Sequence, residues 1–556
     1  MNPLAKEMQR SIAEGLMGRT LAGSCSRWAT KRRVMGGDFP GPYSWKYHPW
    51  CKELHDTQAP ENYAMKGAQL GVTEVAINRA FYTIDQLKRD VLYVLPTAQT
   101  ASDFSKGRFT VALKHSEYLA SIFTDTNTVN MKQAGTCNLY IRGSRGESNL
   151  VSLPISELIL DELDRMAQKE IAEAKERVTG QKKHHIWGLS TPTIPNYGIH
   201  KLYNQGTQEH YTFKCPHCSR HTELIYPECL EIVGDSVHDI RCKESFLKCK
   251  ECKHRLEHEL KPDWLADGSW HSMAPNANPD KRTFHISQMY SFTVTPGDLA
   301  VAYFAGLGDE AMAKEFHNSK LGLPFIGEGA QVTDDLIEQA IGRYTMNDER
   351  PRIGGERLIT MGIDQGQIVS HWVVCEWFVD QMSSDINIAA KCKVLAHGKF
   401  MGEDWHVAED LMAEWQVLAC VVDADPQIAE ARRFAKKFPR YVTLCRYRRG
   451  KVAREISIAD DESGVEMATV DRTNWLTTSL GRFRNKRIML PADVSVEYRE
   501  MMKALVRTYV KDEDGNYMAT FVETAPDHYA HAFNYAEIAL PLAASITTGK
   551  DVSKFL

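Results

Sequence analysis

The chain has 556 residues, of which 43% are hydrophobic and 25% are charged. This balance supplies apolar side chains for real cores and excludes disorder as the main state, and the length is enough for about three to five domains. The net charge of −5 excludes a protein that coats DNA through an overall positive charge. Residues 1–10 show no secretory signal, and no apolar run approaches the ~18 residues of a membrane span. The 13 cysteines favour reduced thiols or a metal over a disulfide framework.

Residues 1–45 are predicted to form an N-terminal arm, because they mix short helical patterns with basic and Gly/Pro-rich stretches. From 46 to 204, short apolar strands alternate with amphipathic helical patterns. Strands are expected at 91–95, 158–160 and 186–189. Strands separated by helices are typical of a parallel, doubly wound α/β sheet.

The segment 63–74, with the sequence YAMKGAQLGVTE, has features of a phosphate-binding loop. Such a loop needs small residues, a lysine for the phosphates, a Ser or Thr for Mg²⁺ and a helix that begins directly after it. Three residues fit this pattern: Gly67, Gly71 and Thr73. The usual lysine before Thr73 is replaced by Val72, whereas Lys66 stands where the pattern has its first glycine. On these residues alone, an ordinary turn between a strand and a helix is an equally good interpretation.

A second element is the apolar strand 156–161, which ends in adjacent acids. Asp161 can hold the shell of a Mg²⁺ ion, and Glu162 can accept a proton from the attacking water. The alternative is a surface Asp-Glu pair that serves a helix N-terminus. The acids follow the glycine loop by about 90 residues, and Ser190-Thr191-Pro192 closes a third strand. This order is that of a helicase-like ATPase core, so the sequence predicts ATP hydrolysis.

Two C-x₂-C pairs, Cys215/Cys218 and Cys249/Cys252, predict a tetrahedral Cys₄ zinc site in a zinc-ribbon-like insertion at 205–265. The 30 residues between the pairs exceed the ~15–20 of the common pattern. Other residues could compete as ligands: Cys229, Cys242 and His217. A zinc ion with four protein ligands would be structural. Residues 266–350 are predicted to be an irregular connector that completes the ATPase region, with a helical stretch near 297–318.

A second α/β pattern at 351–556 carries acids at the ends of its predicted strands. Asp364 follows the strand 358–363, and Asp423 follows the strand 418–422. The helix expected at about 527–545 offers Asp527 and His531. Together these groups could bind two metal ions for phosphodiester hydrolysis, with Asp364 bridging the two ions. Each acid by itself would more often be a solvated loop residue or a helix cap.

The segment 431–454 contains ten Lys or Arg residues, interleaved with aromatic residues, and no Asp or Glu. This local surplus predicts a surface that contacts the phosphate backbone of DNA. The residues proposed for DNA contact are Arg446, Arg448, Arg449 and Lys451. A solvated helix face is the alternative.

The glycine loop, the Asp-Glu strand end, Ser190-Thr191-Pro192, the cysteine pairs and the later acids together resemble the large terminase subunit of tailed bacteriophages. They are most similar to its lambda-type (GpA) branch. The stretches that carry this resemblance are 65–74, 160–164, 189–193, 213–218 and 321–324. The family implies a RecA/P-loop-type ATPase domain that drives viral DNA into a prohead, followed by an RNase H-like nuclease domain at 351–556 that cuts the concatemer.

The resemblance also implies roles for individual residues in the ATPase domain. It makes Lys66 the phosphate lysine and Thr73 a ligand of Mg²⁺. Ser190 and Thr191 resemble the motif that couples hydrolysis to DNA movement. Arg142 and Arg145 are candidates for an arginine finger, and Tyr43 is a candidate for contact with adenine.

In the nuclease domain, Asp364 and Asp423 match the first two metal acids of the family. Related proteins tend to show an Asp-His-x-x-Asp pattern, and His531 stands here in place of the second Asp. That departure leaves Asp527 or His531 as the third ligand. Because imidazole binds Mn²⁺ better than Mg²⁺, a nuclease with His531 as ligand is expected to favour Mn²⁺.

The implied cofactors are ATP, Mg²⁺ or Mn²⁺, and Zn²⁺. The implied partners are double-stranded DNA, the portal protein of the prohead, the small terminase subunit and further copies of the chain in a ring, all in the cytoplasm of the host cell. One alternative is a cellular helicase or translocase with an appended nuclease, which would need a second RecA-like lobe that 266–350 does not show. The other is a zinc-ribbon DNA-binding scaffold with an inactive ATPase, which would leave Glu162 and Asp364 without a task.

Overall fold

The computed structural model describes residues 23–37, 40–124, 127–145, 155–178, 180–181, 183–348, 358–379, 385–448, 455–511 and 515–556. The chain divides into two compact units, and the division lies between Phe325 and Ile326. The segment 266–350 is therefore shared between the two units. Among the described helices, none has the length and the apolar character that a membrane crossing requires.

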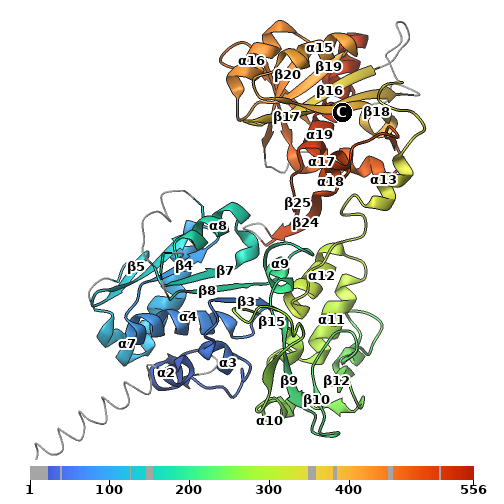
Figure 1. Cartoon of the computed structure of the whole chain (residues 1–556). Helices are drawn as coiled ribbons and strands as arrows, with labels where there is room; N and C mark the ends of the chain where they lie inside the picture. The colour runs from blue at the N-terminus through green and yellow to red at the C-terminus, as the bar shows by residue number, and fades with distance from the viewer. Residues whose placement is uncertain are drawn as a thin grey trace, which may run out of the picture. The chain divides into compact units, whose positions relative to one another are not determined.

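The N-terminal unit is built on one sheet, which has ten strands in the described residues (Figure 1). These strands are β3 (Glu61–Lys66), β4 (Val91–Leu95), β5 (Met131–Ala134), β6 (Cys137–Gly143), β7 (Glu157–Asp161), β8 (His185–Ser190), β9 (Glu209–Lys214), β10 (His221–Thr222), β14 (Ser269–Ser272) and β15 (Lys281–Ile286). Their order is β10-β9-β15-β3-β8-β7-β4-β6-β5, and β14 also pairs with β9. Neighbours from β9 to β6 run parallel, whereas β5, β10 and β14 run antiparallel to their partners.

The strands expected at 91–95, 158–160 and 186–189 are confirmed as β4, β7 and β8. β4 and β7 are buried along their whole length, as expected for a parallel sheet that is covered on both faces. The helices of this unit are α2 (Cys25–Arg32), α3 (Cys51–Asp56), α4 (Val72–Tyr82), α5 (Ala98–Phe104), α6 (Val111–His115), α7 (Glu117–Ile122), α8 (Gln168–Glu176), α9 (Gly198–Asn204), α10 (Lys261–Trp264), α11 (Pro296–Gly306) and α12 (Glu310–Glu315). A short hairpin, β1 (Val34–Met35) and β2 (Gly41–Pro42), lies between α2 and α3.

The segment expected to be an irregular connector contributes a central strand to the sheet. β15 lies between β9 and β3 and pairs with β3 along all of its length. Its first residues, Lys281 and Arg282, are charged and hide the strand pattern. Arg282 is tolerated there because its guanidinium pairs with Glu209 of β9 at 2.5 Å and with Glu53 of α3 at 2.8 Å. Charge pairing between distant segments thus produces a strand that periodicity does not reveal.

The cysteine-rich segment 205–265 is continuous with the main sheet through β9. β10 also belongs to the main sheet, and the three remaining strands of the segment form a separate antiparallel sheet of β11 (Leu230–Glu231), β12 (Phe246–Lys248) and β13 (Arg255–Leu256). The first cysteine pair precedes this small sheet, since Cys218 lies before β11, and the second pair lies in the connection between β12 and β13.

The C-terminal unit has a sheet of eight strands in the described residues (Figure 1). They are β16 (Leu358–Asp364), β17 (Val369–Phe378), β18 (Lys391–Met401), β19 (Ala419–Asp423), β20 (Val442–Arg448), β21 (Ile456–Asp460), β22 (Glu466–Asp471) and β23 (Ile488–Met489), in the order β21-β22-β20-β19-β16-β17-β18-β23. β16, β17 and β18 are antiparallel, whereas β19 and β20 run parallel to β16. A hairpin of β24 (Leu505–Lys511) and β25 (Tyr517–Glu523) stands beside this sheet, and the helices are α13 (Asp334–Ala340), α14 (Ile386–Ala389), α15 (His406–Glu414), α16 (Ile428–Lys437), α17 (Arg472–Arg484), α18 (Val496–Lys503) and α19 (His528–Thr548).

Helix α19 packs directly on β16 at the centre of this sheet. A Cβ atom at Gly362 of β16 would lie only 2.0 Å from the carbonyl oxygen of Ala532 and 2.3 Å from the amide nitrogen of Ala536. Glycine is therefore required at 362 for the helix to approach this closely. The approach brings the first turn of α19 beside the end of β16, where Asp364 lies.

Candidate active sites

The predicted phosphate loop joins β3 to α4 at the carboxyl end of β3, which is an inner strand of the sheet. Lys66 is the last residue of β3, Gly71 caps α4 and Thr73 lies in the first helical turn. The first N–H groups of a helix have no partner within the helix, and its dipole favours an anion at this end. The loop therefore leads directly into a helix N-terminus that favours an anion.

Both glycines of this loop are required by its surroundings. Gly71 has φ 76°, and a Cβ atom there would lie 2.8 Å from the His48 ring. A Cβ atom at Gly67 would lie 3.0 Å from the carbonyl oxygens of Ser319 and Lys320. The backbone is also anchored, because Gly67 N–H donates to Ile286 O at 2.8 Å and Ala68 N–H donates to Ser319 O at 2.7 Å.

The predicted acids lie two strands away, at the end of β7. Asp161 is buried and accepts hydrogen bonds from the Tyr93 hydroxyl at 2.6 Å and from the Glu162 N–H at 3.0 Å. Its pKa is raised to about 6, because burial and the Glu162 carboxylate raise it more than the Lys66 ammonium and the Tyr93 hydroxyl lower it. Lys66, Asp161 and Glu162 thus share one electrostatic environment. Tyr93 is a member of this site that the sequence pattern did not indicate.

Glu162 has a backbone conformation that few residues other than glycine adopt. Its φ is 59°, in the left-handed region that costs an ordinary residue free energy. Its side chain is 34% exposed and lies 3.6 Å from Arg165. Such conformations are concentrated at functional sites, and here the turn leaves the carboxylate accessible beside the buried Asp161.

Ser190 and Thr191, the predicted coupling residues, connect to the acidic turn through Asp164. The Ser190 hydroxyl accepts from Asp164 N–H at 3.1 Å and donates to Thr191 O at 2.9 Å. The Asp164 carboxylate accepts from the N–H and the hydroxyl of Thr193, both at 2.8 Å, and from Ile199 N–H at 2.6 Å. Burial raises the pKa of Asp164 to about 6. Asp164 and Thr193 were not assigned from the sequence, although both lie within three residues of the assigned motifs.

Of the two arginine candidates, one lies on β6 and the other lies just after it. Arg142 is on β6, four strands from β3, which corresponds to about 19 Å at the usual strand spacing. Its guanidinium donates to the carbonyl oxygens of Asn130 and Ile141. Arg145 follows the end of β6. Tyr43 is buried against Trp45 and His55, with ring centroids 5.2 and 5.7 Å apart.

The four predicted zinc ligands converge. The sulfur atoms of Cys215, Cys218, Cys249 and Cys252 all lie within 4.8 Å of one another, and no other group of three or more potential ligands among the described residues is as compact. The sulfurs of Cys215 and Cys252 are 3.9 Å apart, close to the roughly 3.8 Å edge of a tetrahedron with Zn–S bonds of ~2.3 Å.

The two cysteine pairs form matching turns. In the first, Cys215 N–H donates to Arg220 O and Ser219 N–H donates to Cys215 O; in the second, Cys249 N–H donates to His254 O and Lys253 N–H donates to Cys249 O. Ser219 and Lys253 both have φ 60°. The competing ligands lie apart, since Cys229 Sγ contacts Glu223 O, Cys242 Sγ contacts Ser236 O, and the His217 ring packs on His254 at 4.2 Å.

In the C-terminal unit, Asp364 ends β16 and Asp423 ends the neighbouring parallel strand β19. Parallel strands place their carboxyl ends at one edge, so the two acids are brought together. Burial raises the pKa of Asp423 to about 6, the Asp425 N–H lowers it, and the Asp364 charge raises it. Asp425 lies beyond the strand and forms an ion pair with Arg446 at 3.0 Å.

Asp527 caps α19 and is held by His531 one turn later. His531 Nε2 lies 3.2 Å from Asp527 Oδ2, and His531 Nδ1 lies 3.0 Å from the Tyr447 hydroxyl. Both ring nitrogens of His531 therefore have protein partners. Arg472 approaches Asp527 to 3.9 Å. This arrangement favours Asp527 over His531 as the third metal ligand.

His528 is a member of this site that the sequence analysis did not assign. Its Nδ1 donates to Asp364 Oδ2 at 2.8 Å, and its ring stacks on His371 at 4.8 Å. The hydrogen bond to Asp364 raises the pKa of His528. The signal was present in the sequence, because His528 directly follows Asp527 at the start of the predicted helix.

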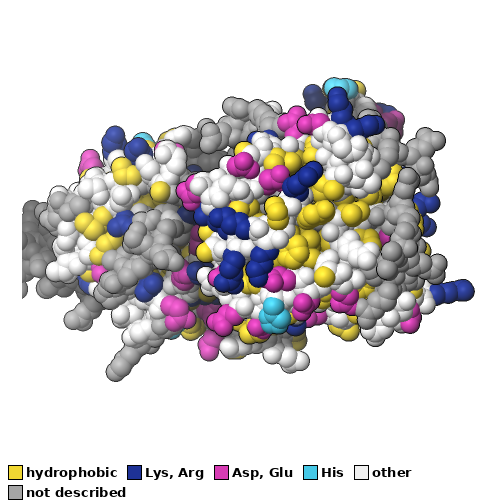
Figure 2. Space-filling view, turned by 90° about the horizontal axis from the view of Figure 1, so that it is seen from above, with side chains coloured by type: hydrophobic (Ala, Val, Ile, Leu, Met, Phe, Trp, Pro, Cys, Tyr) yellow, Lys and Arg dark blue, Asp and Glu magenta, His cyan; other side chains and the backbone are white. Residues whose placement is uncertain are grey.

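Several of the described cations in the basic segment 431–454 pair with acids from outside it. Arg432 pairs with Asp461 at 2.7 Å, Lys437 pairs with Glu409 at 2.5 Å, and Arg446 pairs with Asp425. Arg448 ends β20, whereas Arg449 and Lys451 lie outside the described residues. Figure 2 shows Lys and Arg side chains with Asp and Glu side chains around them on the face seen from above. The excess of positive charge on the surface of this segment is therefore smaller than the sequence of the segment suggests.

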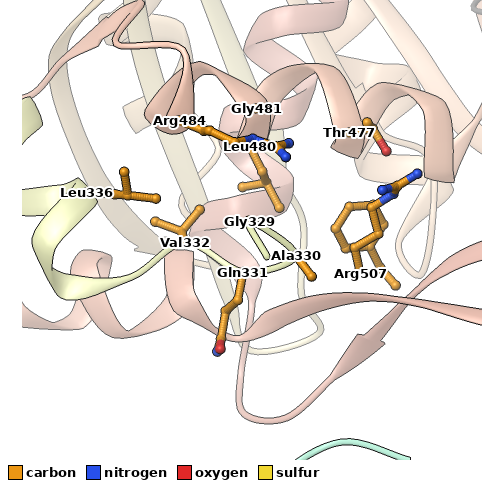
Figure 3. Close-up of a pocket in the computed structure, with 11 residues that line it drawn as sticks. Gly329, Ala330, Gln331, Val332, Leu336, Thr477, Leu480, Gly481, Arg484 and Arg507 are labelled. Atoms are coloured by element: carbon orange, nitrogen blue, oxygen red, sulfur yellow. The ribbon is translucent and has the colours of Figure 1, made fainter. Parts of the chain in front are cut away.

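A pocket in the C-terminal unit lies between the segment 329–336, α17 and the β24–β25 hairpin. Figure 3 shows Val332 and Leu336 on one side of it and Arg507 on the other. None of the candidate metal acids lines this pocket. Its lining is mainly apolar, so it is distinct from the acidic site.

Comparisons with known proteins match two domain families, with a boundary between residues 270 and 281, whereas the compact units divide between Phe325 and Ile326. Residues 37–270 match the family described as phage terminase large subunit gpA, ATPase domain, and residues 281–544 match the terminase large subunit gpA, endonuclease domain. A comparison with curated proteins found no match.

Among solved structures, the HK97 bacteriophage large terminase is similar at 11% identity, with 94% of this chain and 99% of that chain covered and a TM-score of 0.49. The ATPase domain of the Thermus phage P74-26 large terminase has 14% identity over 51% of this chain and 94% of that chain, with a TM-score of 0.31. The large terminase nuclease of the thermophilic phage G20c has 13% identity over 36% of this chain and 94% of that chain, with a TM-score of 0.21. On its matches to the two domain families, the chain belongs to the gpA family of phage terminase large subunits, which are ATPase packaging motors with a nuclease domain.

Proposed function

We propose that ATP is hydrolysed at the edge of the N-terminal sheet where β3 and β7 end. Lys66 and the N–H groups at the start of α4 would bind the phosphates, while Gly67 and Gly71 let the backbone approach them. Thr73 and Asp161 would hold Mg²⁺, which supplies neutralising charge when bound. Glu162 would accept the proton of the attacking water. Asp164 would link this reaction to Ser190, Thr191 and Thr193.

The observation that carries this assignment is the environment of Asp161. A buried carboxylate beside a second carboxylate is unfavourable by itself, which is why the pKa of Asp161 is raised to about 6. A divalent cation would relieve this repulsion. The Tyr93 hydroxyl holds one carboxylate oxygen of Asp161 and so fixes the orientation of this group.

The variant Glu162→Gln tests this proposal. It should bind ADP and ATP as wild type does, because Lys66, Thr73 and Asp161 remain. It should not turn over ATP, because an amide does not accept the proton of water. Steady-state phosphate release and nucleotide titration measure the two properties, and Glu173→Gln on α8, a partly exposed glutamate paired with Lys169, is a matched control. Normal turnover by Glu162→Gln would remove Glu162 from the mechanism.

For DNA cleavage we propose that Asp364, Asp423 and Asp527 hold divalent metal ions, Mg²⁺ or Mn²⁺. The repulsion between Asp364 and Asp423 fits a cation between them. When bound, such ions supply an activated water and stabilise the leaving oxygen. His531 and Tyr447 would fix the orientation of Asp527, and His528 would fix Asp364. The strand order β18-β17-β16-β19-β20, with three antiparallel strands followed by two parallel ones, supports an RNase H-like domain.

We further propose that the four cysteines bind one structural Zn²⁺ in a zinc-ribbon-like region, and that the parallel sheet is a RecA-type ATPase core. The family supports double-stranded DNA as the substrate. The portal protein of the prohead, the small terminase subunit and a ring of copies of this chain are the proposed assembly partners, in the host cytoplasm. Sedimentation of the purified chain with and without proheads would test the assembly.

A further inference from the structure

An arginine that no motif indicates lies beside the phosphate loop. Arg108 is on the π-helical turn Ser105–Thr110, between α5 and α6. Its Nη2 lies 2.7 Å from Oε1 of Glu74, and its side chain is 46% exposed. Glu74 directly follows Thr73 in the first turn of α4. Isolated π-helical turns are rare and are frequent at functional sites.

Glu74 is shared between two arginines that differ in freedom. Arg33 binds its Oε2 at 2.5 Å, is 3% exposed and is also fixed by Asn78 Oδ1 at 2.6 Å. Arg108 binds the other oxygen, and among the described residues it makes no second hydrogen bond. Its guanidinium carbon also lies over the Phe104 ring, 5.9 Å from the ring centroid. Arg33 can therefore neutralise Glu74 when Arg108 moves away.

The charges of this triplet suit an anion. Two guanidinium groups against one carboxylate leave one positive charge at the N-terminus of α4. Burial raises the pKa of Glu74, but the charges of Arg33 and Arg108 outweigh burial and hold this pKa below its usual value. If neither arginine were present, the negative charge of Glu74 would repel a polyphosphate at this end of the helix.

A second set of contacts connects Arg108 to the acidic side of the site. Phe104, one turn before Arg108, stacks on Tyr93 with ring centroids 5.2 Å apart, and Phe109 packs edge-on against Tyr93 at 5.3 Å. The Tyr93 hydroxyl binds Asp161. The segment that carries Arg108 thus contacts Glu74 beside the phosphate loop. It also contacts Tyr93, whose hydroxyl binds Asp161.

We propose that Arg108 leaves Glu74 when ATP binds and contacts the terminal phosphate, as the arginine that stabilises the transition state from within the same chain. In that step the water oxygen bonds to the terminal phosphorus, the bond from this phosphorus to the bridging oxygen of ADP breaks, and the water proton passes to Glu162. The guanidinium neutralises charge that develops on the transferred phosphoryl group. This inference rests on the proposed ATP site and names a further residue of it.

The test is steady-state ATP hydrolysis and ADP titration with the full chain. Arg108→Ala should lower kcat by at least about 100-fold, because arginine fingers contribute on the order of 10³–10⁵, with an unchanged Kd for ADP. Arg108→Lys should recover part of the rate, since the charge remains without the fork. Glu74→Gln should lower the KM for ATP, because Arg108 is then no longer held in an ion pair that ATP binding must break. Lys106→Ala is the matched control, since Lys106 is exposed on the same turn. This variant should hydrolyse ATP at the wild-type rate.

The outcomes separate this inference from the proposed ATP site itself. Wild-type kcat in Arg108→Ala, together with an inactive Glu162→Gln, would overturn the role of Arg108 and leave the site intact. A weaker Kd for ADP in Arg108→Ala would show contact with the inner phosphates and overturn the assignment to the terminal one. Normal turnover in both variants would overturn the ATP site. ADP binding by Arg108→Ala also shows that the variant is folded.

Discussion

The two candidate metal sites of this chain differ in how completely the fold assembles them. The four sulfurs of the cysteine cluster lie within 4.8 Å of one another. The carboxylates of Asp364, Asp423 and Asp527 do not form so compact a group, and histidines and an arginine fill the space around them. Protonated thiols do not repel one another, whereas ionised carboxylates do. The cysteine cluster is therefore a compact group in the structure, whereas the three carboxylates are not as close to one another.

The largest expected effect concerns the cysteine cluster. Cys215→Ser should lose zinc and lower the melting temperature of the N-terminal unit strongly, because the binding free energy of structural zinc, about 10–16 kcal/mol in small peptides, is folding free energy. Metal analysis and thermal unfolding measure both. Cys229→Ser is the matched control, since Cys229 is equally buried but outside the cluster. Full zinc content in Cys215→Ser would refute the assigned ligand set.

The next effect concerns cleavage at the carboxylate site. Asp527→Ala should lose plasmid cleavage, because one metal ligand is removed. Asp425→Ala should keep it, since Asp425 is exposed and paired with Arg446. Gel assays of the full chain in Mg²⁺ and in Mn²⁺ would distinguish the two variants. Equal activity of the two variants would show that the acids at the end of β19 and the start of α19 are assigned wrongly.

A smaller effect is expected from the group that holds Asp527. Tyr447→Phe removes the hydroxyl that fixes His531 and should reduce cleavage about 10–100-fold, as for other groups that orient metal ligands. His531→Asn should have an effect of similar size and leave the choice between Mg²⁺ and Mn²⁺ unchanged. A shift of this preference toward Mg²⁺ would instead make His531 a metal ligand.

The pH dependence of stability sharpens the same contrast. The pKa of Asp423 is about 6 in the folded chain, against 3.8 for an aspartate that is not perturbed by the fold. The folded state therefore binds the proton more tightly than the unfolded state. The free energy of unfolding should therefore fall as pH rises from about 4 to 6. In metal-free buffer at pH 7, Asp423→Asn should stabilise the C-terminal unit by about 1–3 kcal/mol. Denaturant unfolding with a chelator measures this, and destabilisation at pH 7 would contradict the account of repulsion.

These differences explain what the sequence could predict. The cysteine turns, the β4, β7 and β8 strands and the acids at their ends are local patterns, and the structure has them. Tyr93, Asp164 and Arg108 could not be assigned, because their partners Asp161, Thr193 and Glu74 lie between 29 and 68 residues away. β15 was missed because Glu209 and Glu53 neutralise its Arg282.

The surface charge of the basic segment also depends on contacts that a window of sequence does not show. A window of sequence shows ten cations but not Glu409, Asp425, Asp461 or Glu462, which pair with several of them. The smallest predicted effect follows from this pairing. Arg446→Ala should change the free energy of unfolding by less than about 1 kcal/mol, because exposed ion pairs contribute little. A loss of DNA affinity much greater than that of Arg433→Ala, another exposed and paired arginine, would restore Arg446 as a DNA contact.

The central claim is that one chain holds two independent reaction sites, ATP hydrolysis at the ends of β3 and β7 and DNA cleavage at the ends of β16 and β19. The direct measurement is ATP turnover and plasmid cleavage by the same preparations of Glu162→Gln and Asp364→Ala. We predict that Glu162→Gln loses turnover and keeps cleavage, and that Asp364→Ala keeps turnover and loses cleavage. Loss of both activities in either variant, or of neither, would contradict the account.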